Sequence, residues 1–278
     1  LAALSGTPTV APLGTDAITL AGVAAGSFAD RNAGLVKPVA VSGLTLAGAD
    51  AGNYSLVLPT TLVADITPRA LSVSGLAAVS RVYDGGTLAA LTGTATVAPL
   101  GGDAVALAGA AVGSFADKNA GAAKPVAVAG LSLTGADAGN YTLQAPAGLS
   151  ADITPAPLPV SGLSAQSRPY DRSTAAPLAG VAAIAPLAGD SVTLGGVAVG
   201  RFDSAAAGVG KPVAVDGLVL AGAEAGNYTL LPPAGLSADV TPLLLSLAGP
   251  AAASRVYDAG TTASVSGSLA GVLAGDAV

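Results

Sequence analysis

Five aspartates in the middle of the chain have side chains that could bind a metal ion. Carboxylate oxygens are hard ligands of the kind that Ca²⁺ takes. These aspartates are spread singly, without an Asp-x-Asp-x-Asp loop, and each stands where a turn would use such a residue. Asp152 and Asp171 could share one ion across a chain joint, but turn and cap roles explain them more simply, so we assign no metal ligand. The five are Asp84, Asp103, Asp117, Asp137 and Asp152.

A lysine, an asparagine and an acid recur together and could form a covalent cross-link. In some β-sandwich proteins a buried lysine joins an asparagine with the help of a neighbouring acid. A lysine before a proline at the start of a strand is expected to be exposed, however, and an asparagine before a tyrosine is a turn residue, so we favour ordinary structural roles. The three sets are Lys37, Asn53 and Asp50; Lys124, Asn140 and Asp137; and Lys211, Asn227 and Glu224.

The composition argues against several classes of protein. The 278 residues include no histidine and no cysteine, so the usual pairs of a catalytic nucleophile and its general base cannot form. We therefore expect that the protein is not an enzyme. The net charge is −6 with 10% charged residues, which argues against binding nucleic acid. No apolar run approaches the roughly 18 residues that span a bilayer, so we expect no membrane insertion in this fragment. We assign no catalytic and no cofactor-binding residue, and no cofactor.

A heptapeptide, Gly-Ala-Asp-Ala-Gly-Asn-Tyr, organises the chain at 48–54 and 135–141, and returns at 222–228 with a glutamate in place of the aspartate. Apolar residues at every second position precede and follow it, which predicts a corner between two strands. We expect Gly135 and Gly139 to adopt positive φ and the Asp137 side chain to accept N–H bonds in the turn. The Tyr141 ring should lie inside, with its hydroxyl free to bond backbone.

The order of residues in the heptapeptide, an acid, a glycine and then a tyrosine that begins a strand, resembles the tyrosine corner of immunoglobulin-like sandwiches. Antibody-type domains carry a cysteine two residues after the tyrosine, whereas leucine stands there in this chain, and tryptophan is absent. The inter-sheet disulfide and the core tryptophan are therefore both missing. The alternative is a β-turn in some other all-β fold. The three leucines are Leu56, Leu143 and Leu230.

Nearly every landmark returns after 87 residues, which predicts a tandem array. Residues 69–155 and 156–242 form complete repeats, 1–68 is the C-terminal part of a repeat, and 243–278 is the N-terminal part of a further one. We therefore expect the sequence to be a segment of a longer array. The recurring landmarks include Phe28, Phe115 and Phe202, the Lys-Pro pairs at 37, 124 and 211, and the Tyr-Asp pairs at 83, 170 and 257.

Each complete repeat is predicted to hold seven or eight short strands and almost no helix. In the middle copy the strands are 71–75, 79–83, 94–97, 104–107, a short piece ending at 115, 125–133, 141–143 and 149–153, with a loop at 117–121. The apolar alternation slips at Gly43, Gly130 and Gly217, which is typical of a β-bulge.

A weaker similarity at an offset of 26 residues, for example between 105–115 and 131–141, raises the alternative of a β-solenoid. We rank discrete sandwiches above it because the 26-residue similarity covers only part of each copy. The joints between copies, such as 64–73, contain no flexible Gly/Ser-rich linker. They are stiffened by Pro68, Pro155 and Pro242. Short joints favour a semi-rigid rod.

Three spaced motifs, Val-Tyr-Asp-Gly-Gly-Thr at 82–87, Ser-Phe-Ala-Asp-Lys-Asn-Ala-Gly at 114–121 and Leu-Thr-Gly-Ala-Asp-Ala-Gly-Asn-Tyr-Thr-Leu at 133–143, together resemble the YDG repeat family. These repeats occur in long bacterial surface proteins similar to filamentous haemagglutinins. The third copy departs from the pattern. There Arg172 replaces the motif's glycine, and Ser204 and Ala206 replace the loop aspartate and asparagine.

Together these observations predict an all-β fold of tandem immunoglobulin-like β-sandwich repeats, 87 residues each, forming an extended rod. The resemblance implies a structural stalk or spacer segment of a secreted or surface-attached bacterial adhesin. The alternative is that the repeats themselves bind a glycan or a protein on a host surface. The expected partners are the neighbouring repeats in the same chain and such a host-surface molecule.

Overall fold

The computed structural model describes residues 2–278 and is an all-β fold. Within these residues each helix is a 3₁₀ helix of three residues, placed directly after the acidic residue of the heptapeptide. The expectation of almost no helix is confirmed. The chain forms two compact units. The helices are η1 (Ala51–Asn53), η2 (Ala138–Asn140) and η3 (Ala225–Asn227).

The first unit runs from the N-terminus to Val79 and also contains Leu88–Ala116 and Pro125–Ala151. It holds a sheet in the order β1–β2–β3, a parallel pair of β4 with β11, and an antiparallel pair of β5 with β8. Strand β9 pairs with both β7 and β10. The strands are β1 (Thr19–Phe28), β2 (Gly34–Ala47), β3 (Val63–Ile66), β4 (Arg69–Ser72), β5 (Ser74–Ala78), β7 (Leu88–Ala89), β8 (Leu91–Thr96), β9 (Ala106–Phe115), β10 (Gly121–Thr134) and β11 (Tyr141–Gln144).

The second unit contains Ser80–Thr87, Asp117–Lys124 and Asp152–Val278. Its five-stranded sheet has the order β15–β21–β19–β18–β16, and the remaining pairs are β13–β20, β14–β17, β22–β23 and β6–β12. The strands are β6 (Arg81–Val82), β12 (Ser150–Thr154), β13 (Ala156–Pro159), β14 (Ser161–Ala165), β15 (Arg168–Pro169), β16 (Ala175–Ala176), β17 (Leu178–Ala183), β18 (Thr193–Phe202), β19 (Gly208–Ala221), β20 (Tyr228–Leu231), β21 (Ser237–Thr241), β22 (Ser246–Ala252) and β23 (Val265–Ala270).

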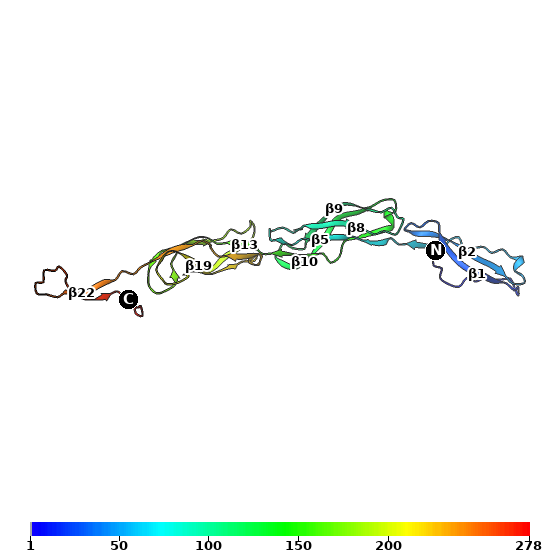
Figure 1. The fold of residues 1–278 in the computed structure, drawn as a ribbon. Helices are drawn as coiled ribbons and strands as arrows, with labels where there is room; N and C mark the ends of the chain where they lie inside the picture. The colour runs from blue at the N-terminus through cyan, green and yellow to red at the C-terminus, as the bar shows by residue number, and fades with distance from the viewer. Residues whose placement is uncertain (1) are drawn as a thin grey trace. The chain divides into compact units, whose positions relative to one another are not determined.

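The third copy closes on itself through parallel pairing between its beginning and its end. Strand β13, which is labelled in Figure 1, pairs in parallel with β20, with Ala156 opposite Tyr228. Strand β15 pairs in parallel with β21. The long strands β18 and β19 are antiparallel neighbours. Successive rungs of a solenoid would be parallel, so the 26-residue similarity does not mark rungs.

The three expected bulges are confirmed. Between β9 and β10 the register shifts around Gly130, which has φ +84°. A Cβ atom there would lie 2.3 Å from the Ala110 carbonyl oxygen, so a side chain cannot be accommodated without a shift of backbone. The same shift occurs around Gly43 and Gly217.

Strand boundaries in the middle copy differ from the prediction at several places: β6 covers only 81–82 of the predicted 79–83, β7 was not predicted, and β8 begins at Leu91 rather than at 94. The predicted strand 71–75 is divided between β4 and β5. Val73 donates its N–H to the Gln144 carbonyl at the end of β11, and the chain then pairs with β8 instead of β11. The two predicted pieces at 104–107 and before 115 form one strand, β9, because the bulge opposite Gly130 interrupts the apolar pattern without ending the strand.

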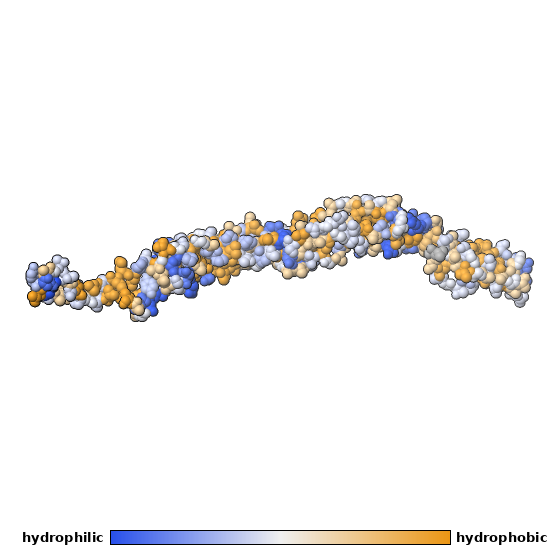
Figure 2. All heavy atoms as spheres, viewed as in Figure 1, coloured by the Kyte–Doolittle hydropathy of each residue, from blue (hydrophilic) through white to orange (hydrophobic). Residues whose placement is uncertain are grey.

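The core of each copy is small. In the third copy one buried cluster consists of Ala176, Phe202, Val213, Ala238 and Val240, each at most 7% exposed. Because Ala and Val bury little surface, each contributes less than Leu or Phe. Many apolar side chains stay at the surface, as the orange residues in Figure 2 show.

The joints between copies are as short as expected. Only Pro155 separates β12 from β13, and two residues separate β3 from β4. A copy therefore passes into the next with almost no free chain.

Candidate functional site

The heptapeptide corner holds a neighbouring loop of its own copy. Gly135 has φ +114°, and a Cβ there would lie 2.1 Å from the Ala104 carbonyl oxygen. The Asp137 carboxylate accepts the Ala104 N–H at 2.9 Å, so it bonds backbone as expected, but across to this loop rather than inside the turn. The expectation for Gly139 is wrong, because its φ is not positive.

The tyrosine of the corner behaves as predicted. The Tyr141 residue is 7% exposed, and its hydroxyl accepts the Leu100 N–H at 2.9 Å. The same hydroxyl donates to the Asp103 carboxylate at 2.6 Å, which raises the pKa of Tyr141. Each complete corner thus orients one carboxylate of the loop beside it.

At the junction inside the first unit, a loop cation of the preceding repeat binds this carboxylate. The Arg31 guanidinium lies 3.0 Å from Asp103 and 3.0 Å from Asp137. The Ala33 N–H donates to the Asn140 side-chain oxygen at 2.7 Å. Arg31 and Asp137 are 106 residues apart in sequence and Ala33 and Asn140 are 107 apart, so these contacts join consecutive repeats.

At the second junction, between the middle and third copies, the corresponding carboxylate is Asp190, whose side chain is 2% exposed. The Lys118 ammonium lies 2.5 Å from it. The Tyr83 hydroxyl donates to Asp190 at 2.8 Å and the Tyr228 hydroxyl at 2.6 Å. The two tyrosine rings meet edge to face, with centroids 5.4 Å apart. One carboxylate therefore collects three donors, two of them from the preceding repeat.

These donors fix the charge state of the cluster. The Lys118 ammonium, followed by the Tyr228 hydroxyl, lowers the pKa of Asp190 to about 2. Asp190 in turn raises the pKa of Lys118. Burial, and then the hydrogen bond to Asp190, raises the pKa of Tyr83. At neutral pH the cluster holds one carboxylate and one ammonium, with both phenols protonated.

The corner asparagine also bridges this junction. Asn227 is 4% exposed, and its side-chain oxygen accepts the Ala120 N–H at 2.8 Å. Its amide nitrogen donates to the Asn119 side-chain oxygen at 3.2 Å. Asn140 makes the same two contacts, to Ala33 and Asn32, in the first unit.

The recurring lysine has a different partner from the one that a cross-link requires. Lys211 lies 2.9 Å from Asp203, and Lys124 binds Asp117 and the Asn119 carbonyl. The lysine side chains are only 11–14% exposed, so the expectation of an exposed lysine is wrong. The geometry gives no support to a Lys–Asn cross-link, because the lysine folds back on its own loop.

The other carboxylates considered as ligands have backbone partners. Asp84 accepts the Gly86 N–H at 2.8 Å inside its turn, whereas Asp152 in β12 accepts the N–H of Ala123 in β10 at 2.7 Å and so does not have the expected turn role. Asp171 pairs with Arg168 and accepts the Ser173 N–H. In residues 2–278 no three such side chains gather where they could hold a metal ion.

The central residue of the site, Asp190, was missed by sequence reasoning, which considered its counterpart Asp103 only as a metal ligand. A signal existed, because a Gly-Asp pair recurs at 102–103, 189–190 and 275–276. Among residues 2–278 no helix is long and apolar enough to cross a membrane.

The fold and the junctions define a class: an all-β protein of tandem repeats whose recurring polar residues bind the next repeat. The YDG domain family matches residues 1–62, 67–148 and 154–235, so this chain belongs to that family. The resemblance predicted from the three motifs is confirmed at this level. No curated protein and no solved structure matches the chain.

Proposed function

We propose that this chain is a structural stalk or spacer segment of a secreted or surface-attached bacterial adhesin of the filamentous-haemagglutinin kind. Its tandem repeats are immunoglobulin-like sandwiches that stack into a semi-rigid rod. The repeats hold a distal binding region away from a cell surface.

The observation that carries this proposal is the use of the signature residues. Tyr83 of the Tyr-Asp-Gly motif, Lys118 of the loop and Asn227 of the corner each contact an adjacent repeat. Side chains occupied in this way are not free to bind a separate ligand. Their recurrence therefore supports a role in joining repeats.

Two further features support a rod and a sandwich. The single residue Pro155 between β12 and β13 leaves little freedom at the joint. The buried Tyr141, whose hydroxyl bonds backbone, resembles the tyrosine corner of immunoglobulin-like domains in its burial and its place at the start of a strand, although its partner Leu100 lies 41 residues upstream and not a few.

Small-angle scattering of the whole 278-residue chain tests the spacer role. We expect one extended shape that does not change with concentration. A compact particle, or the profile of freely jointed repeats, would contradict the proposal.

A glycan array and a cell-binding assay with the same chain address the alternative. We expect no saturable binding. Saturable binding that survives substitution of Asp190 would instead favour repeats that themselves recognise a glycan or a host-surface protein.

A further inference from the structure

We propose that Arg172 binds the aspartate of the following repeat at the junction after the third copy, as Lys118 does at the junction before it. The cation that makes this ion pair lies in the Tyr-Asp turn at the later junction and in the loop at the earlier one. Arg172 is therefore the residue that selects and holds the repeat beginning after residue 242. This inference extends the proposed function by naming a determinant of repeat–repeat pairing.

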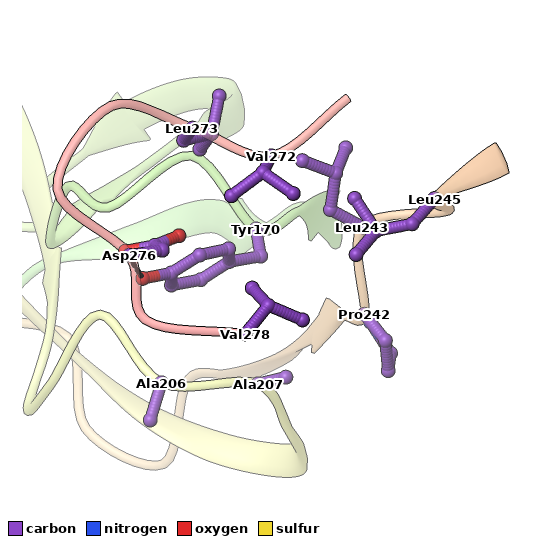
Figure 3. Close-up of a pocket in the computed structure, with 10 residues that line it drawn as sticks. All are labelled: Tyr170, Ala206, Ala207, Pro242, Leu243, Leu245, Val272, Leu273, Asp276 and Val278. Carbon is purple, nitrogen blue, oxygen red and sulfur yellow. Dashed lines mark hydrogen bonds between the residues drawn. The ribbon is translucent and has the colours of Figure 1, made fainter. Parts of the chain in front are cut away.

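The loop of the third copy has lost its cation. Ala205 stands where the middle copy has Lys118, and Ala206 stands where it has Asn119. Ala206 and Ala207 line an apolar cavity of about 380 Å³ beside Tyr170 (Figure 3). The methyl groups of this loop offer no charge to the following repeat.

The acceptor carboxylate is nevertheless present and in place. Tyr170 donates its hydroxyl to Asp276 at 3.1 Å, as Tyr83 does to Asp190 (Figure 3). The Arg172 Nε atom lies 3.3 Å from the same carboxylate. Asp276 therefore has a tyrosine and a cation from the preceding repeat, which is the pairing that Asp190 has.

The arginine stands in a conformation that favours glycine. Arg172 has φ +70°, and the glycine at the same place in the middle copy, Gly85, has φ +80°. A side chain at positive φ is disfavoured relative to glycine. Its guanidinium lies against Gly275, where a Cβ atom would come within 2.7 Å of an arginine nitrogen. An arginine held in a strained turn and against a glycine of the next repeat is accounted for by its contact with Asp276.

The turn position faces the following repeat at the second junction as well. A Cβ atom added at Gly85 would lie 3.7 Å from the Leu187 side chain, in the loop that ends at Asp190. A long cationic side chain at position 85 therefore starts close to the loop that carries the acceptor. A cation in the loop and a cation in the turn can therefore each reach the aspartate of the following repeat.

Hydrogen–deuterium exchange on the whole chain tests this directly. In Arg172→Gly we expect amides of 272–276 to exchange about two- to fivefold faster, the size of effect that a partly exposed ion pair gives. The added substitution Ala205→Lys, which restores the loop cation, should slow this exchange again. High salt should reduce the difference between the wild type and Arg172→Gly.

The reciprocal experiment uses the second junction. Lys118→Ala should speed exchange in 187–190, and Gly85→Arg added to it should restore protection. Gly148→Arg is the matched control, because Gly148 has φ +75° and no neighbour within 4 Å of an added Cβ, so it adds the same charge and a similar backbone strain.

Two outcomes would overturn the proposal. One is that Arg172→Gly leaves exchange in 272–276 unchanged or slows it, as simple relief of backbone strain would. The other is that Gly148→Arg restores the Lys118→Ala variant as well as Gly85→Arg does, which would reveal an effect of net charge alone.

Discussion

The Tyr83 hydroxyl donates a hydrogen bond to Asp190 at 2.8 Å, although the two residues are 107 positions apart and belong to consecutive repeats. The tyrosine of the Tyr-Asp-Gly motif is thus part of a junction. The same carboxylate receives the Lys118 ammonium and the Tyr228 hydroxyl. The motifs that make the repeat recognisable are those that bind it to the next one.

Asp190→Ala should destabilise the chain by about 1–3 kcal/mol, because the buried hydroxyls of Tyr83 and Tyr228 lose their acceptor. Urea denaturation of the whole chain measures this. Asp216→Asn, on an exposed position of β19, is the control and should change stability little. Equal stability of the wild type and Asp190→Ala would mean that the cluster contributes nothing.

The contribution of Asp190 should disappear in acid. Its pKa lies near 2 in the folded chain, below the ordinary value of 3.8, so its charged form is favoured by folding. The stabilisation is therefore present above about pH 3.8 and is lost as the pH falls toward about 2. Thermal unfolding of wild type and Asp190→Asn across this range should give curves that converge. A gap that stays constant down to the acid end would refute the assignment.

Asn227→Ala should make the backbone amide of Ala120 at the second junction more accessible to solvent exchange. The half-buried Ala120 N–H loses its acceptor, and leaving such a donor without a partner costs up to about 1–3 kcal/mol, the range for a fully buried donor. Exchange at the Ala120 amide should rise about tenfold, the factor that 1.4 kcal/mol gives. Asn53→Ala is the matched control, because Asn53 has the same place in the first copy and is exposed. Similar effects from both variants would show that the asparagine acts inside the turn alone.

Gly130→Ala should destabilise the hairpin of β9 and β10 by more than about 1 kcal/mol, because φ is +84° and the new Cβ would meet the Ala110 carbonyl oxygen. Gly139→Ala is its control, since Gly139 has open space and no positive φ. The midpoint of urea denaturation distinguishes them. Equal midpoints would mean that the bulge can be remodelled at little cost.

Local features of the fold were predictable because they depend on neighbours in sequence. Alternating apolar residues placed the long strand β10, and the slip at Gly130 placed the bulge. The prediction was less accurate where the chain changes partner, as at Val73, because that switch depends on Gln144 and not on adjacent residues. The burial of Lys124 was likewise missed, because its partner, Asp117, lies across a loop.

The sequence by itself determined the repeat, most of its strands, its glycine bulges and its family, since each follows from residue types at fixed short spacings. Only the tertiary structure decided which carboxylate meets which cation. Asp190 and Lys118 come together because two folded copies place them side by side. No pattern in the 71 residues between them predicts that contact. The physical reason is that an ion pair depends on a distance of a few ångströms in space, which chain folding sets and local pattern does not.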